Sequence, residues 1–151
     1  MRNFFLLIFL TFIYSCGYTS IYQDQIKKDL LINIEETKGD YEINNFIRND
    51  LKIASNLKST NIYNLSYVTN YQRIILAKDA TGKATDYNLD MSVKFKIISK
   101  QNKELVFTEN FKIKNNSKNF EQSNYEKEIK RNFSRIVKDK LIIYLLKIND
   151  N

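Results

Sequence analysis

The alternation of apolar and polar residues from Leu89 to Ile97 is the feature that most restricts how this 151-residue chain can fold. Every second residue is apolar and the residues between are polar or charged, which is typical of a strand with one buried face. The pattern returns from Leu105 to Ile113, after the polar segment Ser99–Lys103. Two such strands joined by a short polar loop predict an antiparallel hairpin with one covered face and one open face.

Two segments with helical spacing can cover that face. Apolar residues recur every three or four positions from Tyr41 to Lys58, after a turn at Gly39-Asp40, and predict an amphipathic helix. A last helix is expected to begin at Ser123-Asn124-Tyr125-Glu126, which matches a capping box. Within it, Leu141–Leu146 is apolar nearly all round, which indicates burial on two sides.

Two further strands are predicted at Leu30–Glu36 and Ile62–Leu76. The tyrosines of the second strand are interpreted as packing rather than as a stacking surface for bases or sugars. Its alternation slips at Arg73-Ile74-Ile75-Leu76, which indicates a bulge or a change of surroundings. The order β-α-β-β-β-α predicts a single α+β domain, with two helices packed on one face of a mostly antiparallel four-stranded sheet.

The chain has one cysteine and no histidine. This composition excludes an intrachain disulfide and the usual zinc, copper and non-haem iron ligand sets. It also excludes Ser-His and Cys-His nucleophile pairs, and no two carboxylates are spaced as a general acid and base. We therefore expect no metal, no catalytic residue and no enzymatic activity. A periplasmic enzyme or sugar-binding module is the least supported interpretation.

Residues 1–15 have the layout of a bacterial lipoprotein signal peptide. A positive charge at Arg2 precedes the apolar run Phe4–Tyr14, which is shorter than the roughly 20 residues that a membrane-spanning helix needs. The segment Ile13-Tyr14-Ser15-Cys16 resembles a lipobox, with an aliphatic residue three positions before the cysteine and a small residue directly before it. We therefore expect residues 1–15 to be removed.

The lipobox resemblance implies that signal peptidase II cuts before Cys16, that its thiol carries diacylglycerol and that its new amino group is acylated. Two or more acyl chains hold a protein stably on a membrane, and no further cofactor is expected. The residue after the cysteine is Gly17 and not the Asp that often marks inner-membrane retention. The expected location is therefore the outer membrane, lipid-anchored, on its periplasmic side.

The formal net charge is +7, which favours anionic partners such as phospholipid or phosphorylated glycolipid. Nucleic acid is not an expected partner, because a secreted, lipidated chain would not ordinarily meet it. On the open face of the predicted hairpin, a basic stripe that can neutralise phosphates is formed by Lys94, Lys96, Lys112 and Lys114. The ordinary alternative is a solvated face without a ligand.

Three stretches of the chain resemble the LPS-assembly lipoprotein LptE, especially its alphaproteobacterial branch. They are the mature start Cys16–Tyr22, the turn and strand Asp79–Ile97, and the hairpin strand that leads through Ser123–Glu126 into the final helix. Thr19 and Ser20 stand where that branch has Arg and Pro. The resemblance implies a lipidated segment at 16–29 and an LptE-like α+β domain at 30–151.

The resemblance also implies a function. A protein of this family sits inside the LptD-type outer-membrane β-barrel, assists its assembly, and contacts lipopolysaccharide (LPS) during export to the cell surface. The family's LPS-contact residues match no motif here, so the lysine stripe is a hypothesis from the strand pattern alone. The alternative is an auxiliary lipoprotein of another outer-membrane lipid or intermembrane transport system.

Overall fold

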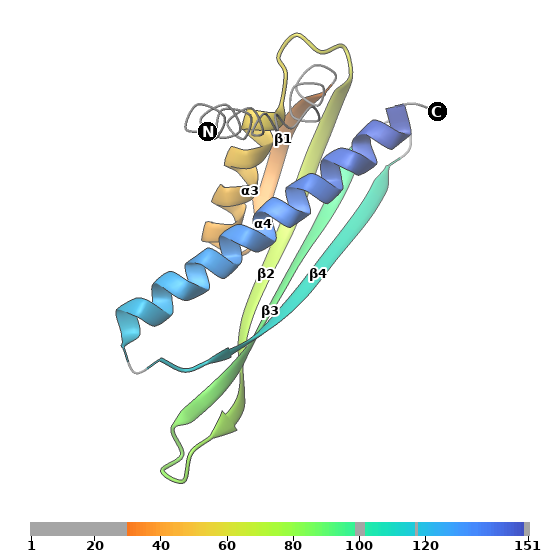
Figure 1. Cartoon of the computed structure of the whole chain (residues 1–151). Helices are drawn as coiled ribbons and strands as arrows, with labels where there is room; N and C mark the ends of the chain where they lie inside the picture. The colour runs from red at the N-terminus through yellow and green to blue at the C-terminus, as the bar shows by residue number, and fades with distance from the viewer. Residues whose placement is uncertain (1–29, 99–101, 117, 150–151) are drawn as a thin grey trace, which may run out of the picture.

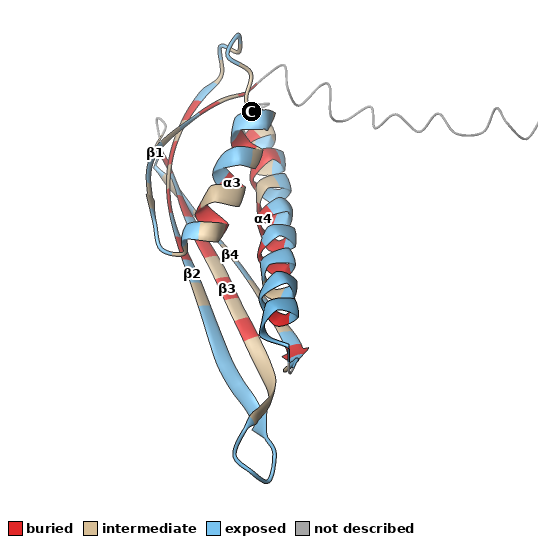
Figure 2. Ribbon diagram, turned by 90° about the vertical axis from the view of Figure 1, so that its left-hand side faces the viewer, coloured by how far each residue is buried: buried red, intermediate tan, exposed pale blue. Residues whose placement is uncertain are grey.

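The structure, a computed structural model, describes residues 30–98, 102–116 and 118–149. Its elements are β1 (Leu31–Lys38), α3 (Tyr41–Ala54), β2 (Ile62–Lys78), β3 (Ala84–Ile98), β4 (Lys103–Lys114) and α4 (Asn119–Asn149). The strands lie side by side in the order β1-β2-β3-β4, with β1 parallel to β2 and the other pairs antiparallel (Figure 1). Both helices lie on the same face of this sheet (Figure 2). The predicted α+β class and element order are confirmed.

The hydrophobic core lies between β2 and β3 on one side and the two helices on the other. The apolar residues of β3 from Leu89 to Ile97 are at most 2% exposed, as their alternation predicted. From α4, Phe133 and Leu141 are fully buried against the sheet, and Ile43 and Leu51 of α3 are also buried. Burial of this one face accounts for the period of two in the strand and the period near 3.6 in the helices.

Buried polar groups in this core are paired. The Tyr63 hydroxyl donates to the carbonyl of Leu145 at 3.2 Å, and the Tyr67 hydroxyl donates to the carbonyl of Asn44 at 3.1 Å. Both rings face the helices, so their interpretation as packing is confirmed. The Thr69 hydroxyl bonds to Asn44 Oδ1 at 2.8 Å, which ties β2 to the first turn of α3.

The first helix ends earlier than predicted. Asp40 caps its start, with Oδ1 accepting from the N–H of Ile43 at 2.9 Å, but the helix stops at Ala54 instead of continuing to Lys58. The chain then turns towards β1, where Ser55 Oγ accepts from the N–H of Ile32. These bonds to β1 outweigh the helical pattern, and Leu57, which that pattern placed in the core, is 88% exposed.

The last helix begins earlier than predicted, and the expected capping box is wrong. The helix starts at Asn119, so Ser123 lies inside it and is exposed. The first turn is held instead by Gln122, whose N–H donates to the carbonyl of Lys118 and whose side chain accepts from the N–H of Asn116. Glu126, the other residue of the supposed box, bonds to the tyrosine side chain of Tyr71 on β2.

The expected irregularity in β2 is present at its far end. The register of β2 with β3 runs unbroken as far as Ile75 and shifts between Ile75 and Ala77, and again before Lys78. The alternation fails as well because every residue from Gln72 to Lys78 is exposed. Here β2 and β3 extend as a hairpin beyond the helices (Figure 1).

Gly39 sets the point at which β1 stops. Its φ is +101°, and a Cβ at this position would lie 1.7 Å from the carbonyl oxygen of Thr69 on β2. The chain can therefore turn against β2 and enter α3 only because residue 39 has no side chain. Past this turn, β2 continues without a strand partner on that side.

Substitution of this glycine gives the first prediction. Gly39→Ala should lower the free energy of unfolding by about 1–3 kcal/mol more than Gly82→Ala, because an added methyl group at 39 overlaps backbone that cannot move freely. The φ of Gly82 is also positive, at +84°, but nothing lies within 4 Å of its Cβ position. Urea denaturation of both variants measures the difference, and equal losses would contradict the role given to the Gly39–Thr69 contact.

Candidate functional site

The helix-free face of the sheet carries the lysines that the sequence singled out. Lys94 and Lys96 on β3, and Lys112 and Lys114 on β4, alternate with residues that face the helices. The strand register nevertheless separates them, because Lys94 lies opposite Val106. At about 3.4 Å per residue, Lys112 is about 20 Å farther along β4. The expected basic stripe therefore consists of two separate pairs at opposite ends of the hairpin.

The Lys94–Lys96 pair is partly neutralised. Lys94 Nζ lies 2.7 Å from Glu104 Oε2, and on β1 the neighbouring Lys38 Nζ lies 2.8 Å from Glu36 Oε1. The hydrogen bond to Glu36, helped by the charge of that carboxylate, raises the pKa of Lys38 above its ordinary value. These residues line a shallow hollow of about 280 Å³. Two carboxylates beside three ammonium groups leave this end weakly basic.

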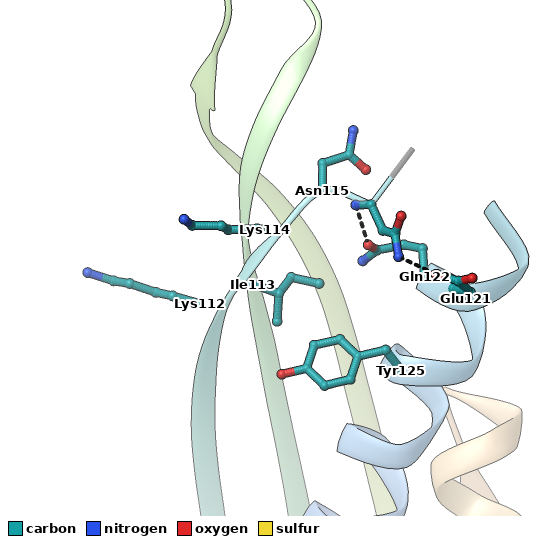
Figure 3. Close-up of a pocket in the computed structure, with 8 residues that line it drawn as sticks. Lys112, Ile113, Lys114, Asn115, Glu121, Gln122 and Tyr125 are labelled. Carbon is teal, nitrogen blue, oxygen red and sulfur yellow. Dashed lines mark hydrogen bonds between the residues drawn. The ribbon is translucent and has the colours of Figure 1, made fainter. Parts of the chain in front are cut away.

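The Lys112–Lys114 pair forms no ion pair with any acidic side chain among the described residues. Both side chains point in the same direction, away from Ile113 and Tyr125 and onto the helix-free face (Figure 3). On the other side of β4 lies a hollow of about 680 Å³ between this strand and the start of α4. Two ammonium groups side by side on an open face can meet the charged oxygens of a phosphate group. Of the two pairs, this one fits an anionic ligand better.

The turn beyond this pair is held by several hydrogen bonds to one carboxylate. Asp79 Oδ1 accepts from the N–H of Thr81 at 2.8 Å, from the hydroxyl of the same residue at 2.6 Å, and from the N–H of Lys83 at 3.0 Å. These bonds, above all the one from the Thr81 hydroxyl, lower the pKa of Asp79 below its ordinary value. Asn115 reaches back to the same hairpin through a bond from Nδ2 to the carbonyl of Ala84. The hairpin and the end of β4 thus hold each other in place.

A partly buried charged cluster, which sequence reasoning missed, joins both helices to β2. Lys130 on α4 is 8% exposed, and its Nζ lies 2.9 Å from both Asp40 Oδ2 and Glu42 Oε2 at the start of α3. The same ammonium lies 4.0 Å from the centre of the Tyr71 ring. Burial alone would lower the pKa of Lys130, but the hydrogen bonds to the two carboxylates raise it.

Glu126 continues this cluster one helical turn earlier. Its Oε2 accepts from the Tyr71 hydroxyl at 2.7 Å, and its Oε1 lies 3.3 Å from an Arg73 nitrogen. The Arg73 guanidinium also stacks over the Tyr87 ring at 3.7 Å. Burial and the bond to Glu126 raise the pKa of Tyr71 well above its ordinary value. Every charge in this cluster has a partner, so it is a structural clamp and no free binding site.

The described residues add two findings on other kinds of site. They contain no group of three or more His, Cys, Asp or Glu side chains that could hold a metal ion. In the same ranges, no helix combines the length and apolarity that crossing a membrane requires. Cys16, the expected lipidation site, lies outside the described residues.

Comparison with known proteins finds likeness in fold and none in sequence. No family model matches the chain, and no curated protein matches it. The rare lipoprotein B of Shewanella oneidensis is similar in structure, with a TM-score of 0.59 and 15% identity over 81% of this chain and 99% of that one. A putative lipoprotein of Caulobacter crescentus is similar with a TM-score of 0.51 and 16% identity, over 77% of this chain and 90% of that one.

A minor lipoprotein of Acinetobacter baumannii is also similar, with a TM-score of 0.52 and 14% identity, over 78% of this chain and 92% of that one. Each of these three chains is matched over at least 90% of its own length. The described domain is therefore similar in fold to nearly the whole of three chains named as lipoproteins.

The clamp predicts a pH dependence. The folded pKa of Tyr71 is raised above 10.0, so the stability it contributes is complete below pH 10 and is lost as the pH rises further, because the unfolded chain ionises first. Tyr71→Phe should lower the free energy of unfolding by about 1 kcal/mol at pH 7, because the hydrogen bond to Glu126 is lost. Between pH 10 and 11.5, the free energy of unfolding of this variant should fall less steeply than that of the unsubstituted chain. Urea denaturation across this range measures both effects.

The control for this experiment is Tyr41→Phe, because the Tyr41 side chain is 77% exposed and loses no buried contact. The free energy of unfolding of Tyr41→Phe should match that of the unsubstituted chain at every pH. A Tyr71→Phe variant whose stability fell with pH as steeply as that of the unsubstituted chain would show that Tyr71 is not the group responsible.

Proposed function

We propose that this protein is an outer-membrane lipoprotein of the LPS transport and assembly machinery, lipidated on Cys16 and anchored on the periplasmic side. Its domain occupies an LptD-type β-barrel, assists the assembly of that barrel, and contacts LPS during export to the cell surface. The observation that carries the proposal is the shared fold, which covers nearly the whole of three proteins named as bacterial lipoproteins. The lipobox at Ile13–Cys16 and the resemblance to LptE support it independently.

The surface of the domain supports binding rather than catalysis. Both helices cover one face of the sheet, which leaves the other face, the strand edges and the hairpin for partners. On that open face, Lys112 and Lys114 offer two adjacent ammonium groups to the phosphates of LPS, whereas Lys94 is already paired with Glu104. We therefore place the LPS contact at the Lys112–Lys114 end and propose no enzymatic role.

Charge removal at the two lysine pairs tests the LPS contact. Lys112→Gln with Lys114→Gln should weaken binding of purified LPS by about five-fold or more at low salt, and the loss should shrink as salt screens the charges. The matched control, Lys94→Gln with Lys96→Gln, removes the same net charge and should weaken binding less. Binding is measured by fluorescence titration with labelled LPS, and equal losses would mean that only net charge matters.

Removal of the acyl anchor tests the location. Cys16→Ala should abolish incorporation of radiolabelled palmitate, because the Cys16 thiol is the site of acylation. It should also leave residues 1–15 attached, because signal peptidase II cuts directly before the lipidated cysteine. Mass spectrometry of the purified chain measures both. Normal lipid labelling of this variant would contradict the lipoprotein assignment.

Co-purification identifies the machinery. The unsubstituted chain, tagged at its C-terminus and extracted from solubilised outer membrane, should bring down a large β-barrel protein in equal amount. Recovery of a different transport complex would favour an auxiliary lipoprotein of another lipid transport system.

A further inference from the structure

The described sheet has three stretches of strand edge without a strand partner, of which β1 is covered at its start and β4 carries several charges. Along β1, the N–H of Ile32 is taken by Ser55 Oγ at 2.9 Å, and the carbonyl of Leu30 accepts from the N–H of Asn56 at 2.7 Å. The edge strand β4 carries five charged side chains, at Lys103, Glu104, Glu109, Lys112 and Lys114. Charges of this kind keep an edge strand from pairing with another chain.

The third stretch is the part of β2 that extends past β1, where the only charged side chains before Asp79 are Arg73 and Lys78. The last residue of β2 with a partner on β1 is Val68, opposite Lys38, and β2 continues to Lys78. From Gln72 onward β2 is exposed along its whole length (Figure 2). Three consecutive apolar residues, Ile74, Ile75 and Leu76, are 43–49% exposed. A bare edge with exposed apolar side chains is a template for strand addition.

The register shows which backbone groups face this open edge. The N–H of Leu31 donates to the carbonyl of Asn61, so odd-numbered residues of β2 turn their backbone groups towards β1. The pairing of β2 with β3 is unshifted as far as Ile75, so the alternation holds to that point. Tyr71, Arg73 and Ile75 therefore direct their N–H and C=O groups outward, where no described strand meets them.

We propose that this edge, Tyr71–Leu76, binds an extended segment of a partner protein as an added β-strand. The proposal rests on the proposed function in taking the partner to be the barrel protein of that complex. The segment should carry apolar residues that pack beside Ile74 and Ile75. It should carry no net positive charge, because Arg73 lies in this edge, Lys78 lies just beyond it and the chain carries +7 overall. The same charge opposes pairing with a second copy of this chain.

Two substitutions at Ile75 test the edge. Ile75→Pro removes the outward N–H, and proline is tolerated at strand edges; Ile75→Lys keeps that N–H but adds the charge that protects natural edges. The matched control is Val106→Pro on the outer edge of β4. The N–H of Asn115 donates to the carbonyl of Thr85, so odd-numbered residues of β4 face β3 and Val106 faces outward. Circular dichroism checks that each variant is folded.

The experiment uses the lipidated chain alone and in the complex extracted from outer membrane. In the complex, amide hydrogen exchange across residues 71–76 should slow at least ten-fold relative to the chain alone. Both Ile75 variants should recover at least five-fold less barrel protein than the unsubstituted chain. The Val106→Pro variant should recover the same amount of barrel protein as the unsubstituted chain.

Three results would overturn the proposal in distinguishable ways. If the unsubstituted chain recovers no barrel protein, the proposed function fails and this inference fails with it. If the barrel is recovered but exchange at 71–76 is as fast as in the chain alone, only this inference fails. If the purified chain alone is a dimer that Ile75→Lys converts to a monomer, the edge binds a second copy and not a partner.

Discussion

The burial of one face of β3 under α4 and α3 is the interaction on which the rest of the structure depends. Its residues from Leu89 to Ile97 are almost fully buried on the helix side, while the residues between them remain on the opposite side, where no described helix packs. A sheet covered on one face only leaves its second face polar. This open face, the strand edges and the projecting hairpin are therefore free to bind other molecules.

Two contacts limit how much of the sheet the helices cover. Gly39 packs so closely on Thr69 that β1 must end there, and the chain turns directly into α3. At the same level, Lys130 joins α4 to the start of α3 and lies over Tyr71 of β2. The three elements are clamped together at this point. Beyond it, β2 and β3 continue as a hairpin in which every residue of β2 from Gln72 is exposed, while β3 stays paired with β4 as far as Asp86.

The sequence predicted those elements whose pattern follows from burial. The strands around Leu89–Ile97 and Leu105–Ile113, the two helices and the single covered face are all read from periodicity, because one side of each element faces the core. The helix ends were wrong because they depend on contacts distant in sequence, as where Ser55 bonds to Ile32 and Gln122 to Asn116. Capping residues of the right type were present at Ser123–Glu126 but had other partners.

The site was predicted less completely than the fold. Alternation places the four lysines on one face, but it carries no information on register, which separates Lys94 from Lys112. Lys130 gave no signal at all, because a lysine in an amphipathic helix is ordinarily solvated, and only the fold brings Asp40 and Glu42 to it from 88 or more residues away. Long-range pairing of charges is a property of the folded chain that a local pattern does not encode.

The positions of these features along the sheet bear on how an anchored domain would work. The described chain enters the sheet at Leu30, beside the start of β2, and β1 runs from there towards Gly39. The hairpin, the Lys112–Lys114 pair and the bare edge of β2 all lie at the opposite end of the sheet (Figure 1). A lipid attached upstream of Leu30 would thus hold the domain by one end and leave the other end free to reach a partner. Because β2 and β3 pair without a register shift from Asn64 to Ile75, the start of the described sheet and the proposed binding end keep a fixed separation.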